Sequence, residues 1–204
     1  MEAGLFRRSR PSMRRELVIL LEERSAKVML ETFLPRVLDE KIEFRLIAFE
    51  GKQDLEKRMT MRIKGYVNEY ARFLVMRDQD SDPSCINLKA RLIEKCNASG
   101  RGDASLVRVA CRELETFYLA DLKAVETALG LKGLSNKQHV AKFRSPDYLT
   151  SPSHELKVLS KQTYEKIGSS REIGRYLDID NARSDSFRNL VQGIKRLEGE
   201  LLAL

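Results

Sequence analysis

Acidic residues follow two apolar runs of the sequence. Glu22 comes directly after the run 16–21, and Asp78 and Asp80 come directly after the run 72–77. In an extended Asp-x-Asp segment both side chains point to the same side, and carboxylate oxygens are the ligands that Mg²⁺ and Mn²⁺ prefer. The spacing therefore indicates a metal site, with solvated loop acids or helix caps as the alternative.

The two apolar runs have the composition of parallel strands that are buried on both faces, which consist mainly of Val, Ile and Leu without alternation. Ligand sites in open α/β sheets lie at the carboxyl ends of such strands. Two further strands are expected at 41–49 and 105–111, with helices at 25–38, 52–64, 82–96 and 116–129. This alternation predicts an α/β fold: a Rossmann-like parallel sheet of about four strands, flanked by helices and joined by right-handed crossovers.

Further acids are candidates for the same sheet edge. Glu113 and Glu115 follow the fourth predicted strand, and the alternative for both is the first turn of a helix, where the helix dipole favours negative charge. Asp82 precedes Pro83, so it is expected to cap a helix rather than to bind a metal. Ser25 is expected to cap the helix that follows the first strand.

The sequence divides into four segments. Residues 1–15 form a basic leader that is expected to be disordered, and Met13 is an alternative start. The α/β domain is expected at 16–129, a loop or excursion at 130–153, and a C-terminal helical appendage at 154–204. Helices are predicted there at 154–167, 170–177 and 185–202, packed on the sheet or on a second copy of the chain. Lys166 and Arg171 in this tail could contact phosphates, or could belong to a solvated helix face.

Composition limits the classes of function. The net charge of +7 over 204 residues favours a polyanionic partner such as nucleic acid. No apolar run approaches the roughly 20 residues that a membrane helix needs, so a soluble protein is expected. Three unpatterned cysteines fit reduced thiols in the cytoplasm, and with two histidines they form no zinc-ligand pattern. No phosphate-binding loop of the Gly-x-x-x-x-Gly-Lys type is present, which excludes ATP hydrolysis by that route.

The runs that end in Glu22 and in Asp78-Gln-Asp80 resemble the toprim fold of topoisomerases, primases and overcoming-lysogenisation-defect nucleases, over about 16–129. Longer motifs resemble a small bacterial stand-alone toprim-like family of unknown function, over nearly the whole chain. These motifs are Leu21-Glu-Glu-Arg-Ser-Ala26, the Arg-Asp-Gln-Asp segment with the following Leu88-Lys-Ala-Arg-Leu92, Glu113-Leu-Glu-Thr-Phe-Tyr-Leu-Ala-Asp121 and Ser184-Asp-Ser-Phe187.

The resemblance implies a metal-dependent nuclease that cleaves DNA or RNA with Mg²⁺ or Mn²⁺. The implied ligands are Glu22, Asp78 and Asp80, with Glu115 as the first choice for a fourth acid and Glu113 as the second. The resemblance also implies an aromatic residue two positions after that glutamate, and Phe117 occupies this place, which tryptophan often takes. The chain departs from the pattern twice: Glu23 replaces a usual glycine, and Ala26 replaces an acid. The missing acid implies one metal ion or help from a partner. Glu23 could compensate, but on an extended segment it is expected to point away from Glu22.

The resemblance also implies a partner, because stand-alone toprim nucleases often act beside an ABC-type ATPase in antiphage defence. A non-catalytic adaptor that binds an ATPase or nucleic acid is the first alternative function. A Mg²⁺-dependent phosphotransfer enzyme acting on nucleotides is the second. Tyr118 could be a nucleophile as in topoisomerases, but packing in the core is favoured because the chain has no room for strand-gating domains.

Overall fold

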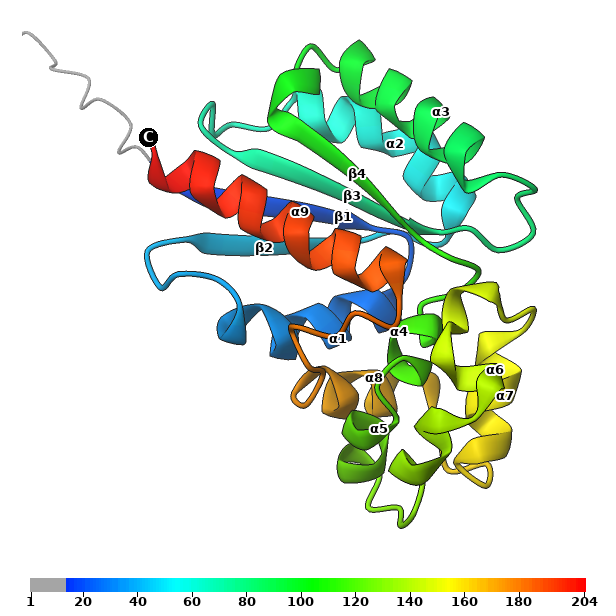
Figure 1. Ribbon diagram of the computed structural model, residues 1–204. Coiled ribbons are helices and arrows are strands. Elements are labelled where there is room, and N and C mark those ends of the chain that lie inside the picture. Colours follow the sequence, from blue (N-terminus) through cyan, green and yellow to red (C-terminus); the bar gives the residue numbers. More distant parts are fainter. Residues whose placement is uncertain (1–13) are drawn as a thin grey trace, which may run out of the picture.

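Residues 14–204, which the computed structural model describes, form a four-stranded parallel sheet flanked by helices (Figure 1). The strands are β1 (Glu16–Leu21), β2 (Glu43–Ala48), β3 (Arg72–Asp78) and β4 (Ser105–Ala110). Their order in the sheet is β2-β1-β3-β4, and each neighbouring pair is parallel. The predicted fold class is confirmed. The predicted leader falls almost wholly on residues 1–13, which lie outside the described residues, as does the alternative start at Met13.

The two central strands carry the most apolar sequences. Every residue of β1 is buried, as are all residues of β3 after Arg72, because helices cover both faces of these strands. Leu21 pairs with Met76, and Asp78 pairs with Ala110. This register brings the ends of β1, β3 and β4 to one edge of the sheet.

Helices form a layer on each face of the sheet. One layer consists of α2 (Lys52–Lys64) and α3 (Cys85–Ala98), which pack on Val18, Leu20 and Val75. The other contains α1 (Arg24–Phe33) and α9 (Asp185–Leu202), which pack on Leu17, Ile19 and Leu74. Figure 1 shows α2 and α3 above the sheet and α1 below it.

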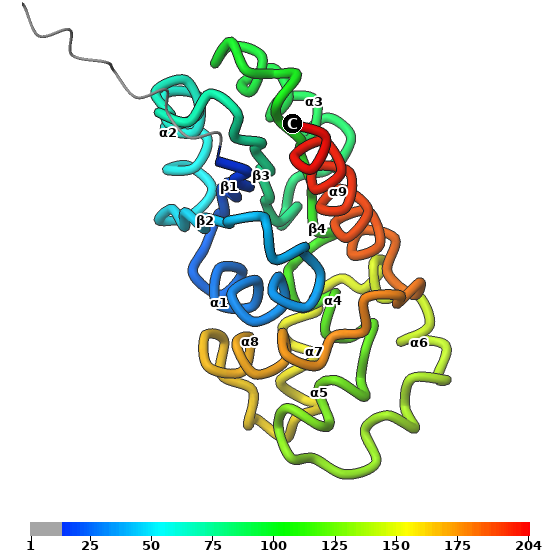
Figure 2. The backbone as a smooth tube through the Cα atoms, turned by 90° about the vertical axis from the view of Figure 1, so that its left-hand side faces the viewer, coloured from blue at the N-terminus to red at the C-terminus, as the bar shows by residue number. Residues whose placement is uncertain are grey.

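A helical lobe follows β4. It contains α4 (Glu115–Leu119), α5 (Leu122–Ala128), α6 (Ala141–Arg144), α7 (Pro152–Leu159) and α8 (Lys166–Gly174). Figure 2 shows this lobe gathered beside α1. The lobe also contains two short 3₁₀ segments, at Ser135–His139 and Pro146–Tyr148. Two others lie outside it, at Leu34–Arg36 after α1 and at Gly102–Ala104 before β4.

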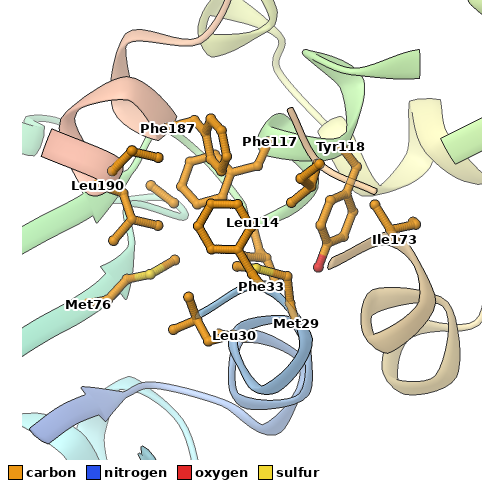
Figure 3. Close-up of a cluster of buried hydrophobic side chains, with 14 of the residues drawn as sticks. Met29, Leu30, Phe33, Met76, Leu114, Phe117, Tyr118, Ile173, Phe187 and Leu190 are labelled. Atoms are coloured by element: carbon orange, nitrogen blue, oxygen red, sulfur yellow. The ribbon is translucent and has the colours of Figure 1, made fainter. Parts of the chain in front are cut away.

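One hydrophobic core joins the lobe to the sheet. The rings of Phe33 and Phe117 lie against that of Phe187, with centroids 5.6 and 5.2 Å away (Figure 3). Tyr118 and Ile173 extend the same cluster (Figure 3). The segment 154–204 is helical as predicted, and it contributes directly to this core. The segment 130–153, predicted as a loop or excursion, contains α6 and short 3₁₀ turns.

Two of the predicted helix starts were wrong. Glu23, not Ser25, is the N-cap of α1, and the Ser25 hydroxyl donates to the Glu23 carboxylate instead. Ser84 caps α3 by accepting a bond from the amide of Asn87, whereas Asp82 forms an ion pair with Arg91 at 3.0 Å. The Glu23 side chain makes no capping bond, so the position of this helix start does not depend on a polar cap, and at α3 several polar residues precede the helix.

Two other helix boundaries also differ from the prediction. The expected helix 116–129 is divided into α4 and α5, because the Asp121 carboxylate caps a new helix by accepting the amide of Ala124 at 3.0 Å. The expected helices 154–167 and 170–177 lie at 152–159 and 166–174, since Pro152 starts α7 and Glu165 caps α8. Within residues 14–204, no helix has the length and apolar character needed to cross a membrane.

Candidate active site

Carboxylates from three strand ends line one cavity of about 230 Å³ at the carboxyl edge of the sheet. Those from the β1–α1 junction are Glu22 and Glu23, those from the end of β3 are Asp78 and Asp80, and those from the β4–α4 connection are Glu113 and Glu115. The opposite wall belongs to the helical lobe and contains Ser153, Lys157, Tyr164 and Lys166. The structure thus brings all the acids of the predicted site together, and it brings Lys166 to the same place.

Glu22 and Asp78 are fixed by the backbone of neighbouring elements. The Glu22 amide donates to the carbonyl of Met76 at 3.3 Å, and its Oε2 accepts the amide of Asp78 at 3.2 Å. Asp78 Oδ2 accepts the amide of Leu114 at 3.0 Å. These bonds connect β1 to β3 and β3 to the start of α4, so the two carboxylates are positioned by the sheet itself.

Asp80 reaches the cavity by a turn rather than by an extended strand. Strand β3 ends at Asp78, and Asp80 has a φ of 51°, in the left-handed region. Its amide donates to the carbonyl of Arg112 at 2.7 Å, and its Oδ2 lies 3.2 Å from Nζ of Lys52. The expectation that an extended Asp-x-Asp segment aligns both acids was therefore wrong in its geometry, although both acids line the cavity.

The two acids near α4 have different surroundings. Glu115 is the first residue of α4, is 1 % exposed, and accepts a hydrogen bond from the hydroxyl of Tyr164 at 2.9 Å. Glu113 accepts the amide of Ser153 at 2.7 Å. Glu115 therefore lies in the first turn of a helix, which was one of the two alternatives from the sequence, and it also lines the cavity at the sheet edge, which was the other.

Glu23 faces the same cavity as Glu22, which contradicts the expectation that it points away. The chain leaves the extended conformation at this residue because α1 begins at Arg24. The Glu23 carboxylate accepts a hydrogen bond from Nζ of Lys166 at 2.7 Å. Arg171, in contrast, is not brought to the cavity; it forms an ion pair with Glu31 at 2.7 Å.

Burial and mutual repulsion raise the pKa of several of these acids. Burial, with the charge of Asp80 second, raises the pKa of Glu22 from 4.5 to about 7. Burial, followed by the charges of Glu23, Glu22 and Glu115, raises the pKa of Asp78 well above its ordinary value. Burial also raises the pKa of Glu115. Among the described residues, six carboxylates and only two lysines line the cavity, so a further cation would be stabilised there.

The raised pKa of Glu22 predicts that, in the absence of metal, the variant Glu22→Gln is more stable than the wild type by an amount that depends on pH. The folded protein binds this proton more tightly than the unfolded chain does, so stability falls as the pH rises from about 4.5 to about 7. We expect Glu22→Gln to raise the free energy of unfolding at pH 8, and to raise it much less at pH 5. Urea titrations at both pH values measure this, and an equal effect at both would contradict the assignment.

No three Asp, Glu, His or Cys side chains within residues 14–204 converge closely enough to form a metal site as they stand. Separate cations hold the acids instead: Asp80 pairs with Lys52, Glu23 with Lys166, and Glu22 lies 3.6 Å from Nε of Arg77. The donor set nevertheless suits a hard divalent cation, since it consists of carboxylates, and the raised pKa of Glu22, Asp78 and Glu115 is what a bound cation would offset.

A larger cavity of about 460 Å³ lies away from these acids, between α5 and the segment after α8. Its lining includes two cations, Lys123 and Arg183, and two acids, Asp121 and Asp178. Asp121 stabilises the fold there: its carboxylate caps α5 and accepts a hydrogen bond from the amide of Asp178 at 2.8 Å. The smaller cavity, where the carboxylates gather, is therefore the candidate site.

Sequence reasoning missed Glu23, Lys157 and Tyr164 as residues of the cavity. Lys157 is exposed and has no ion-pair partner within residues 14–204. Tyr164 is 49 positions from the carboxylate that it contacts. The spacing of apolar positions predicted a helix around Lys157, but it did not show which face of that helix meets the sheet edge. Tyr164 lies between α7 and α8, where periodicity gives no signal.

Comparison with known proteins places the chain in a family. The family described as "Domain of unknown function (DUF4276)" matches residues 21–195, which include every residue of the cavity. The chain belongs to the DUF4276 family. A search of curated proteins gave no match.

The structure is similar to the C-terminal region of the Burkholderia pseudomallei OLD protein. The TM-score is 0.54 at 13% sequence identity, and the alignment covers 89% of this chain and 98% of that chain. At this identity the likeness shows a shared fold. The chain thus shares the α/β fold of that region.

Proposed function

We propose that this member of the DUF4276 family is a metal-dependent nuclease that hydrolyses phosphodiester bonds in DNA or RNA. The observation that carries the proposal is the gathering of Glu22, Asp78, Asp80 and Glu115 in one cavity at the carboxyl edge of a parallel sheet. The fold shared with the C-terminal region of the OLD protein supports it, as does the toprim-like sequence pattern.

The four carboxylates would hold Mg²⁺ or Mn²⁺, with Glu113 as a further candidate ligand. A bound metal ion supplies polarisation of the phosphate and a more acidic water as nucleophile. The protein contributes the positions of the ligands: the amide of Asp78 fixes Glu22, and the amide of Leu114 fixes Asp78. No side chain then has to act as the nucleophile. Tyr118, the alternative nucleophile, is fully buried in the core.

Two lysines on the lobe side of the cavity suit the phosphate backbone of the substrate. Lys157 has no ion-pair partner among residues 14–204, and Lys166 reaches Glu23. Cations beside the site attract phosphates and offset charge as it develops in phosphoryl transfer.

The double variant Lys157→Gln and Lys166→Gln is expected to bind nucleic acid more weakly and with a smaller dependence on salt. Each lost phosphate contact lowers the slope of log K against log salt by about 0.7–0.9. Fluorescence anisotropy with a labelled oligonucleotide between 50 and 200 mM salt measures the slope. Arg171→Gln is the matched control, since that residue pairs with Glu31 outside the cavity. An unchanged slope in the double variant would refute the role of the lysines.

The proposed activity is tested by incubating the protein with supercoiled plasmid, linear DNA and total RNA. We expect cleavage of at least one substrate with Mg²⁺ or Mn²⁺, and none with a chelator in excess. Absence of cleavage with either metal, both alone and with a candidate ABC-type ATPase, would contradict the proposal.

A non-catalytic adaptor is the second candidate function. Position 26, where the toprim-like pattern has an acid, is a buried alanine, and no three acids among residues 14–204 converge on one point. The four carboxylates that line the cavity favour the nuclease. A role in cytoplasmic antiphage defence beside an ABC-type ATPase is part of our proposal and is supported by the sequence resemblance alone.

A further inference from the structure

Two residues that flank the N-cap of α8, Tyr164 and Lys166, contact acids from two different strand ends. The hydroxyl of Tyr164 donates to Oε1 of Glu115 at 2.9 Å, and Nζ of Lys166 donates to Oε2 of Glu23 at 2.7 Å. Between them, the carboxylate of Glu165 caps α8 by accepting the amides of Ile167 and Gly168. The start of α8 thus touches the ends of both β1 and β4.

Tyr164 is held firmly in this place. It is 5 % exposed, its amide donates to Oγ of Ser160 at 3.2 Å, and its ring lies 6.3 Å from that of Tyr118. The hydroxyl of Ser170 lies 3.5 Å from the Tyr164 hydroxyl. The contact with Glu115 is therefore made by a side chain that has little freedom to move.

The helix that carries this contact is packed tightly against α1. A Cβ atom added at Gly174 would lie 2.4 Å from the carbonyl oxygen of Met29 and 2.4 Å from Oγ1 of Thr32, so only glycine fits there. The Thr32 hydroxyl also donates to the carbonyl of Arg171 at 2.8 Å. This packing holds the C-terminal end of α8 against α1, the helix that begins directly after Glu23.

We propose that Tyr164 is a positioning residue for the metal site, acting through Glu115. Its hydroxyl occupies one carboxylate oxygen of Glu115 and sets the orientation in which that group faces the cavity. Partners of this kind, which bind a ligand rather than the metal, commonly change metal affinity by about 10- to 100-fold when they are removed. This inference rests on the proposed metal site, and it assigns a role to the C-terminal helices in building it.

The variant Tyr164→Phe tests the proposal in the full-length protein. Phenylalanine keeps the ring and its packing against Tyr118 and removes only the hydroxyl. We expect Mn²⁺ affinity, measured by titration calorimetry, to fall by about tenfold or more. Tyr176→Phe is the matched control, since Tyr176 is 48 % exposed and does not line the cavity, and its affinity should equal that of the wild type.

A double-mutant cycle separates positioning from general destabilisation. If Tyr164 acts through Glu115, then adding Tyr164→Phe to the variant Glu115→Gln should change Mn²⁺ affinity by less than about twofold, because coupled residues do not act additively. The full tenfold loss in that background would overturn the proposal. Wild-type affinity in Tyr164→Phe would also overturn it and leave the nuclease proposal intact. Failure of the wild type itself to bind Mn²⁺ would overturn both.

Discussion

The variant Asp78→Asn is expected to lose nuclease activity by about 1000-fold or more, because a metal ligand contributes several kcal/mol to transition-state stabilisation. The same variant should be at least as stable as the wild type. Burial and three neighbouring carboxylates raise the pKa of Asp78, so its charge opposes folding in the absence of metal. The asparagine oxygen can still accept the amide of Leu114.

Both halves of this prediction are measurable on one preparation. Cleavage is followed at saturating Mg²⁺ or Mn²⁺, and thermal unfolding is followed in chelator. Asp103→Asn is the matched control: Asp103 is exposed and lies just before β4, away from the carboxyl edge of the sheet. Unfolding of Asp78→Asn would indicate a structural role, and full activity would remove Asp78 from the site.

Of the variants proposed for this protein, Arg77→Met is expected to lower the free energy of unfolding the most. Arg77 is 3 % exposed, and its Nη1 lies 2.6 Å from Glu56 and 3.5 Å from Asp82, while its Nε lies 3.6 Å from Glu22. Removing one partner of a buried ionic network leaves uncompensated charge and costs about 3–5 kcal/mol. The free energy of unfolding, obtained from urea titration at pH 8, measures this loss.

Arg91 provides a control within the same network. It pairs with Glu56 and Asp82, the same two acids, but its side chain is 43% exposed. Exposed ion pairs contribute about 1 kcal/mol or less, so Arg91→Met should have a small effect. Equal losses in the two variants would show that burial of Arg77 is not the cause.

The sequence predicted the sheet well because its central strands are buried on both faces. The apolar runs before Glu22 and Asp78 have no polar side to obscure their ends, so the acids that follow them could be placed at one edge. The same reasoning failed one or two residues further on. Glu23 and Asp80 both lie where the chain leaves the strand, and their directions depend on local turns that periodicity does not describe.

The lobe side of the site could not be predicted from local sequence. Tyr164 and Lys157 reach the cavity because α7 packs against α4 and α8 packs against α1. Contacts between segments so far apart in the chain cannot be predicted from the spacing of apolar residues within one segment. The sequence does not distinguish Lys166 from Arg171, because both are basic residues of the same tail. They are five positions apart on α8 and therefore face different directions, so one reaches Glu23 and the other Glu31.

The central claim, a divalent metal ion held by the acids at the sheet edge, is tested most directly by anomalous diffraction from crystals soaked in Mn²⁺. We predict an anomalous peak in the cavity, at about 2.0–2.2 Å from carboxylate oxygens of Asp78 and at least one of Glu22, Asp80 and Glu115, the ligand distance typical of a small hard cation. An empty cavity at saturating Mn²⁺, or a peak only at acids outside it, would contradict the account.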